Sequence, residues 1–263
     1  MKEIEIFDGV FLIDEYADME ELKFKGEDVV MLDGKSGFPK KIEIEDCGIV
    51  RMIGTYCKGV DSLSIDAEII QLTHMVPAPK VIELTDSCQE LWLNGADVTG
   101  TELKLEKGGD RLYIEHSTGI KAGTDFSGFK FVELDEDDMK DFDSYKFQDG
   151  GSVSMRLCSG FPKKLDLSKL QFIDLSGADF SGVEELIFRE GTVVDISGAK
   201  NLPKTLDLSK CKEVRARNTN LTGVKKIVYK DNEQASKFIN EVDYDTYPCV
   251  RIGPSFGGGG MDM

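Results

Sequence analysis

The sequence repeats itself with a fixed period, and this feature limits the possible folds more than any other. The segments Phe161–Ser168 and Leu202–Ser209 share the pattern apolar-Pro-Lys-X-Leu-Asp-Leu-Ser and lie 41 residues apart. Another copy begins at Phe38, and Pro79 follows Pro39 by 40 residues. A repeat of this length is typical of a solenoid, in which every repeat builds one coil or a pair of coils.

Two triplets of the form apolar–X–apolar recur within the repeat, and both have a period of about 20.5 residues. The middle residues of the first series are Glu5, Lys23, Glu43, Ser64, Glu83, Lys104, Lys146, Asp166, Ile187, Asp207 and Val228, with one blurred copy near Asp125. Those of the second series are Leu12, Met31, Arg51, Gln71, Trp92, Tyr113, Glu133, Ser154, Asp174, Asp195 and Arg215. Because both series stay in step over most of the chain, chance does not explain them.

Each triplet has the alternation of a short β-strand whose flanking residues face a core and whose middle residue faces solvent. Coils stacked at the ~4.8 Å spacing of paired strands form two parallel sheets around one apolar core. The sequence therefore predicts a mainly β, right-handed solenoid of about twelve coils, each with two short parallel strands. It occupies residues 1–230 as one domain and is irregular near 116–150.

A helix is expected to close the C-terminal end of the solenoid. Asp231 or Asn232 can act as its N-cap, and one apolar stripe follows, made of Ala235, Phe238, Ile239 and Val242. We assign residues 231–256 to this cap, including a last strand at 248–252, and residues 257–263 to a flexible glycine-rich tail. No comparable helix precedes Glu5, so the first coil is expected to be an open end.

The repeat resembles the leucine-rich-repeat core LxxLxLxxN. Val224, Ile227, Tyr229 and Asn232 occupy its four defining positions, and Pro39–Cys47 fits with Cys at the last one. A second regular strand in place of a helical segment makes the chain most similar to short, strand-rich bacterial leucine-rich-repeat proteins. This resemblance implies a protein-binding scaffold without identifying the ligand.

A pentapeptide-repeat β-helix is the rival architecture, because Leu175–Gly182 reads locally as two quintets. Such helices need an apolar residue every five positions. The triplets are separated by about 8 and then 12 or 13 residues, which breaks that phase. The spacing therefore favours the leucine-rich-repeat interpretation.

Charge and cysteine placement narrow the function classes. The net charge of −17 disfavours nucleic acid and anionic membranes as partners, and no run of about 18 apolar residues predicts a membrane span. The start lacks the layout of a signal peptide, which favours a cytoplasmic protein, or a secreted one if a signal has been removed. The six cysteines include no CxxC pair and mostly follow strands at inward corners, which predicts buried free thiols and no metal or other cofactor.

Few residues are suited to catalysis. Asp174 and Asp195 face outward on neighbouring coils, about 5 Å apart in backbone spacing, which is close to the separation in retaining glycosidases. The alternative is that Asp is simply the solvated residue of the repeat, as at Asp166 and Asp207. His74 and His116 share a column two coils apart, too far for a common metal. The acidic segment 133–143 is either a calcium site or a solvated loop.

The outward column of the second series is the best candidate for partner binding. Trp92 and Tyr113 are aromatic residues one coil apart, of the kind that anchor interfaces. The predicted partner-binding residues are Trp92, Tyr113, Arg51, Arg111, Leu12 and Met31, and Val10, Val29, Ile49 and Ile69 extend an apolar patch toward the N-terminal end. We therefore expect a non-enzymatic protein-interaction scaffold. The alternatives are a carbohydrate-active solenoid using Asp174 and Asp195, or a structural rod that self-associates through its N-terminal end.

Overall fold

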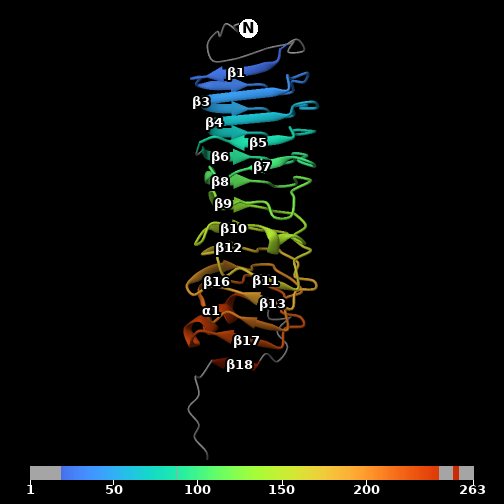
Figure 1. The fold of residues 1–263 in the computed structure, drawn as a ribbon. Coiled ribbons are helices and arrows are strands. Elements are labelled where there is room, and N and C mark those ends of the chain that lie inside the picture. Colours follow the sequence, from blue (N-terminus) through green and yellow to red (C-terminus); the bar gives the residue numbers. More distant parts are fainter. Residues whose placement is uncertain (1–18, 87, 243–250, 255–263) are drawn as a thin grey trace, which may run out of the picture. The chain divides into compact units, whose positions relative to one another are not determined.

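A computed structural model describes residues 19–86, 88–242 and, for the backbone alone, 251–254. The chain divides into two compact units. Unit 1 comprises Met1–Glu133 with Tyr145–Gln148, and unit 2 comprises Leu134–Ser144 with Asp149–Met263. Each unit is a β-solenoid of parallel strands, and the two together contain about ten turns (Figure 1). The segment 116–150, expected to be irregular, contains the boundaries between the units.

Unit 1 stacks its strands in the order β1-β3-β4-β6-β8-β9, with β2 beside β3, β5 beside β4 and β7 beside β5. Their bounds are β1 Glu21–Lys25, β2 Val29–Met31, β3 Lys41–Arg51, β4 Ser62–Gln71, β5 Val81–Leu84, β6 Cys88–Trp92, β7 Glu102–Lys104, β8 Gly109–Tyr113 and β9 Phe129–Glu133. The paired residues are the predicted ones: Lys23, Glu43, Ser64, Glu83 and Lys104 in the first series, and Met31 to Glu133 in the second. The blurred copy is also present, as a bridge between Asp125 and Lys146.

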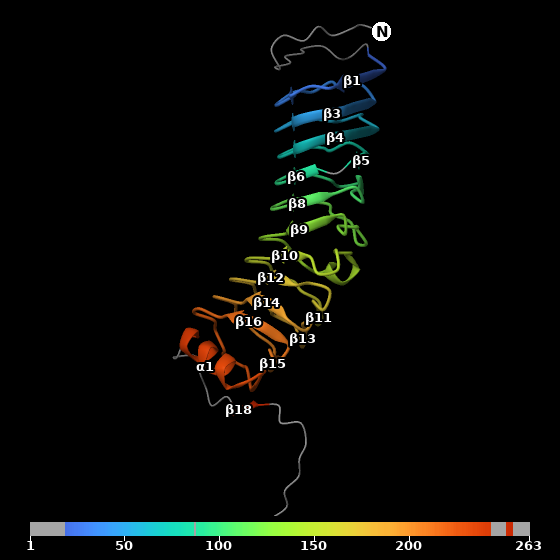
Figure 2. The same ribbon diagram turned by 90° about the vertical axis from the view of Figure 1, so that its left-hand side faces the viewer.

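Unit 2 repeats the arrangement with separate strands for the two series (Figure 2). Second-series strands follow the order β10-β12-β14-β16, and first-series strands form the two-stranded sheet β11-β13 and the three-stranded sheet β15-β17-β18. Their bounds are β10 Ser152–Ser154, β11 Lys164–Asp166, β12 Phe172–Asp174, β13 Glu185–Ile187, β14 Thr192–Asp195, β15 Thr205–Asp207, β16 Cys211–Arg215, β17 Lys226–Tyr229 and β18 Arg251–Pro254, with a 3₁₀ turn, η1, at Phe142–Ser144. Here too Ser154, Asp174, Asp195 and Arg215 lie in register.

The flanking residues of the triplets build the core, as predicted. Leu22 and Phe24 on either side of Lys23 are 0% and 3% exposed, and Leu165 and Leu167 beside Asp166 are both fully buried. Burial of such side chains contributes about 25 cal/mol of stability per Å² of apolar surface removed from water. This is the main contribution that holds one coil on the next. A single coil has no second layer to cover its apolar edge, so the repeats are stable only as a stack.

Three features of the coils differ from the prediction or go beyond it. In β3 and β4 the two predicted strands join into one bent strand, because the short corner keeps its parallel hydrogen bonds, such as Gly48 N to Glu27 O at 2.9 Å. A third column of parallel bridges links successive coils, at Ser36–Tyr56, Asp97–Thr118, Asp138–Ser159 and Asp179–Lys200. The expected count of twelve coils is not established, since its first coil, with Glu5, Val10 and Leu12, lies outside the described residues.

In the described part of the chain, every second-series strand ends in a turn with a left-handed residue three positions after the strand centre. This residue is Gly at five coils and a larger side chain at the other five, with φ between 54° and 69°: Gly34, Gly54, His74, Gly95, His116, Glu136, Leu157, Gly177, Gly198 and Asn218. Gly adopts this conformation freely because it has no Cβ, and Asn and Asp tolerate it. Other residues adopt it at a cost of about 1 kcal/mol. The five glycine coils therefore turn without this cost and the Asn218 coil with little, and the coils ending at Glu136 and Leu157 are among those that bear it.

The predicted capping helix is α1, Asn232–Glu241, and Asp231 is its N-cap, accepting a hydrogen bond from Gln234 N at 2.8 Å. Ala235, Phe238 and Val242 are buried on its inner side. The predicted last strand is β18, which begins at Arg251, later than expected, and pairs with β17. The rest of the predicted cap and the 257–263 tail lie outside the described residues. Within the described part of the chain, no helix is long and apolar enough to cross a membrane.

Candidate functional site

The second-series strands of unit 1 present a continuous outer surface, which we call the second-strand face. Two adjacent columns of outward positions make up this face, and each column is in register from coil to coil. The first column consists of Val29, Ile49, Ile69, Glu90, Arg111 and Phe131, and the second of Met31, Arg51, Gln71, Trp92, Tyr113 and Glu133. The strands β3, β4, β6, β8 and β9, which carry most of it, stack on one another in both views (Figures 1 and 2).

The N-terminal half of the second-strand face is apolar. Val29, Ile49 and Ile69 lie on three successive coils, and each is only half-buried, as is Met31 beside them. β-branched side chains suit a pleated strand, but here they stand on the side away from the core. Sequence reasoning placed this patch correctly as far as the described residues extend.

The C-terminal half of the face is an aromatic cluster. The rings of Trp92 and Tyr113 are stacked with centroids 3.9 Å apart, and Phe131 meets Tyr113 edge-on at 6.4 Å. Tyr113 is consequently only 9% exposed, whereas Trp92 keeps a half-exposed side chain. Tyr113 therefore supports the cluster from within, and Trp92 is its accessible member. Phe131 was missed by the sequence analysis, although it precedes Glu133 by two residues just as Arg111 precedes Tyr113.

Polar contacts hold the aromatic cluster in place. Trp92 Nε1 donates to Glu90 Oε2 at 3.1 Å, and Arg111 Nη1 donates to the Tyr113 hydroxyl at 3.3 Å. The Arg111 guanidinium also lies 5.9 Å from the centre of the Phe131 ring, within cation–π range. The structure thus brings together three of the predicted binding residues: Trp92, Tyr113 and Arg111.

The other predicted binding residues lie apart from this cluster. Arg51 lies two coils from Trp92, with Gln71 on the coil between them, and pairs with Asp33 at 2.8 Å. Its Nε is buried and has no hydrogen-bond partner among the described residues. Met31 lies beside Arg51 in the same column, and Leu12 lies outside the described residues.

The first-strand face of unit 1 has the same backbone geometry and a different chemistry. Its outward residues are mainly charged and form a ladder, with Lys41 Nζ 2.6 Å from Glu21 Oε1 and Lys23 Nζ 3.0 Å from Glu45 Oε1. Hydrogen bonds from the lysines lower the pKa of Glu45, and the same bonds raise the pKa of Lys23. This alternation is typical of a solvated sheet surface, so the apolar second-strand face is the exception within its own unit.

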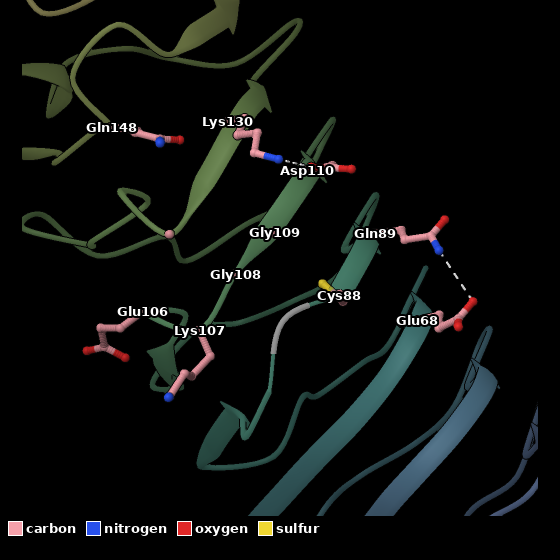
Figure 3. A pocket seen from close by; sticks show the side chains of 11 residues that line it. Glu68, Cys88, Gln89, Glu106, Lys107, Gly108, Gly109, Asp110, Lys130 and Gln148 are labelled. Atoms are coloured by element: carbon pink, nitrogen blue, oxygen red, sulfur yellow. Dashed lines mark hydrogen bonds and ion pairs between the residues drawn. The ribbon is translucent and has the colours of Figure 1, made fainter.

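A polar hollow of about 490 Å³ borders the aromatic end of the second-strand face (Figure 3). It opens where the backbones of Gly108 and Gly128 approach so closely that a Cβ on Gly108 would lie 2.5 Å from the carbonyl carbon of Gly128. Among the side chains that line it, Lys130 pairs with Asp110 at 2.5 Å and Gln89 donates to Glu68 at 3.3 Å. The lining residues are Glu68, Cys88, Gln89, Glu106, Lys107, Gly108, Gly109, Asp110, Gly128, Lys130 and Gln148.

Asp174 and Asp195 are register neighbours, as predicted, but both carboxylates are engaged in their own turns. Asp174 Oδ1 accepts from Ser176 N at 2.9 Å, and Asp195 Oδ1 accepts from Ser197 N at 2.8 Å. The same Asp-X-Ser turn recurs elsewhere, for example at Asp207 with Ser209. The aspartate that the sequence analysis considered for catalysis thus has a repeated role in ending the strand.

The remaining candidate groups have structural surroundings. His74 and His116 are exposed and occupy the left-handed turn column, with the coil of Gly95 between them. In the acidic segment, Asp135 is 3% exposed and accepts hydrogen bonds from the Ser154 hydroxyl and from Arg156 N and its guanidinium. Calcium binding by that segment stays a prediction.

Five of the six cysteines fall within the described residues, and all five are free and buried, as predicted: Cys47, Cys57, Cys88, Cys158 and Cys211. Burial raises the pKa of Cys57 to about 11 and that of Cys158 to about 12. These thiols therefore stay protonated at neutral pH and behave as small apolar core residues.

Comparison of the chain with protein-family models, with curated proteins and with solved structures found no match.

Proposed function

We propose that the chain is a non-enzymatic scaffold of the leucine-rich-repeat type that binds a protein partner through the second-strand face of unit 1. The contrast between the two faces of that unit carries this proposal. One face is covered by lysine–carboxylate pairs, and the other carries the half-buried Val29, Ile49 and Ile69 beside an ordered aromatic cluster. Apolar surface kept in register over several coils is costly in water unless a partner covers it.

We propose the leucine-rich-repeat type because the repeats match the pattern LxxLxLxxN and because each coil is short. The aromatic cluster supports a role in recognition because Trp92 is held by its bond to Glu90 and by stacking on Tyr113. A fixed aromatic side chain loses little conformational entropy when a partner covers it, which is why Trp and Tyr are enriched among interface hot spots. Catalysis by Asp174 and Asp195 receives no comparable support, because their carboxylates already bind backbone amides.

Affinity capture from extracts of the source organism tests the proposal, with variants that alter one face at a time. Ile69→Thr reduces the apolar surface of the second-strand face and keeps the β-branched shape, and Trp92→Ala removes the accessible ring. Val81→Thr is the matched control, since Val81 is a half-buried outward residue of the first-strand face. We expect a protein that is captured by the wild type and the Val81 variant and lost with the other two.

Identical capture by all four folded proteins would rule out the second-strand face as the binding surface. Light scattering at high concentration addresses the third expectation, a self-associating rod. A concentration-dependent increase in mass that Ile69→Thr abolishes would show that the same face binds a second copy instead of a different protein.

A further inference from the structure

A line of carboxylates runs along one edge of the second-strand face. The residues are found in the corners that lead into the second-series strands, on five successive coils of unit 1. We call them the acidic rim: Glu27, Asp28, Asp46, Asp66, Glu68, Asp86 and Asp110. Five of them are exposed, Lys107 is the lysine described in these corners, and Lys130 follows in the corner of the next coil.

The rim adjoins the apolar column directly. Asp28 immediately precedes Val29, and Glu68 immediately precedes Ile69. Because parallel strands repeat every ~4.8 Å, carboxylates in corresponding corners of neighbouring coils repel one another. The first-strand face reduces this repulsion by alternating Lys with Glu. The rim carries few lysines, and one of them, Lys130, pairs with Asp110 at 2.5 Å.

This charge distribution bears on the identity of the partner. A second copy of the chain would bring another surface of the same sign, at a net charge of −17, toward the rim. A partner with lysine or arginine beside its apolar residues would instead neutralise the rim while it covers the column. Complementary charge of this kind steers association and selects among partners more than it adds affinity.

We propose that the second-strand face of unit 1 binds a basic amphipathic polypeptide segment, whose apolar side chains cover Val29, Ile49 and Ile69 and whose lysines or arginines pair with the acidic rim. This inference rests on the proposed function and adds the chemical class of the partner. Its consequence is that binding weakens with salt and depends on both features together, the apolar column and the rim.

Three synthetic peptides test the proposal by fluorescence anisotropy against the full chain. All three carry the same leucines on one side, and the other side carries lysine, serine or glutamate. We expect the lysine peptide to bind, the serine peptide to bind more weakly and the glutamate peptide not to bind. Raising the salt from low to about 0.5 M should weaken binding of the lysine peptide at least several-fold, because exposed charges are screened beyond a few ångströms there.

Charge-matched variants separate specific binding from general attraction to an acidic protein. Asp28→Asn with Glu68→Gln removes two charges from the rim, and Glu83→Gln with Glu102→Gln removes two from the first-strand face. We expect about a fivefold loss of affinity for the lysine peptide in the first variant and little change in the second. Ile69→Thr should also weaken binding, with Val81→Thr as its control, and circular dichroism should show that every variant folds.

Two kinds of result would overturn the inference. Equal losses in the rim variant and in the first-strand variant would mean that only net charge attracts the peptide, and absence of binding by the lysine peptide would reject the partner class. If the serine peptide binds as tightly as the lysine peptide and Ile69→Thr abolishes binding of both, the second-strand face is the binding surface. The proposal that the partner is basic would then be wrong. The proposed function itself is decided separately, by the capture experiment.

Discussion

Glu241 accepts a hydrogen bond from the backbone N–H of Ala216 through Oε2 at 2.8 Å. In the preceding coil the equivalent amide, Ile196 N, donates to Arg215 O of the next strand. The carbonyl oxygen of Glu241 likewise receives Asn218 N at 3.1 Å, in the place where Gly198 N donates to Arg217 O. The last residue of α1 therefore supplies the two acceptors that a further coil would have provided, and so ends the second-series sheet of unit 2.

Because Glu241 takes the place of a further coil, the stability of the protein should depend on its side chain. Glu241→Ala should lower the free energy of unfolding by about 1–2 kcal/mol, because it leaves the amide of the buried Ala216 without its acceptor. Glu241→Gln keeps an acceptor oxygen and should lose much less. Urea unfolding followed by circular dichroism measures both, with Glu233→Ala, an exposed change in the same helix, as the control. Equal stability of the Glu241→Ala protein and the control would contradict this role.

The left-handed turn column predicts a stabilising substitution. Leu157 has φ of 59° and is 60% exposed, so its side chain adds little burial to offset its backbone strain. Leu157→Asn should raise the free energy of unfolding by about 0.5–1 kcal/mol, since Asn tolerates this conformation. Leu157→Ala removes the same exposed side chain and keeps the strain, so it should show no gain. A larger gain for Ala than for Asn in thermal unfolding would mean that exposure, and not the backbone, limits stability there.

The surroundings of Asp179 predict that part of the protein's stability is lost at low pH. Hydrogen bonds from Asn201 and Ser181 lower its pKa to about 2, from an ordinary value of 3.8. The carboxylate form is thus favoured in the folded state, so its stabilising contribution is complete above pH ~4 and is lost as the pH falls through 3.8 toward 2. Asn201→Gly removes the amide donor and still permits the left-handed backbone at this position, where φ is 57°.

Nuclear magnetic resonance titration of the Asp179 carboxyl should show its pKa rising toward 3.8 in the Asn201→Gly protein. Asp166 provides an internal reference, because its pKa is lowered mainly by Ser168, which the substitution leaves in place. A pKa of Asp179 that does not move would show that Ser181 and the backbone alone account for the shift.

The strands and their register could be predicted from the sequence because each triplet buries its two flanking residues, which leaves a period-two signal in every coil. Lys23 with Glu43 and Trp92 with Tyr113 were therefore paired correctly. What the middle residues do was harder to predict, since it depends on contacts outside the triplet. Asp174 bends back to the amide of Ser176, and Tyr113 is covered by Phe131 from the next coil. The Asp-X-Ser spacing and the glycines three residues after five of the second-series centres were signals that could have revealed the turns.

Trp92 offers a direct measurement on the candidate face, because it is the single tryptophan of the chain. One side of its ring is covered by Tyr113, so Tyr113→Ala should shift its emission to longer wavelength and increase quenching by acrylamide. Loss of the stacked ring should also lower the free energy of unfolding by about 2 kcal/mol. Tyr113→Phe keeps the stack and removes only the hydroxyl that Arg111 contacts, so its emission should match the wild type. If both variants shift the emission equally, the stacking does not fix the position of Trp92. The contact between Arg111 and the Tyr113 hydroxyl would then be the interaction that orders this surface.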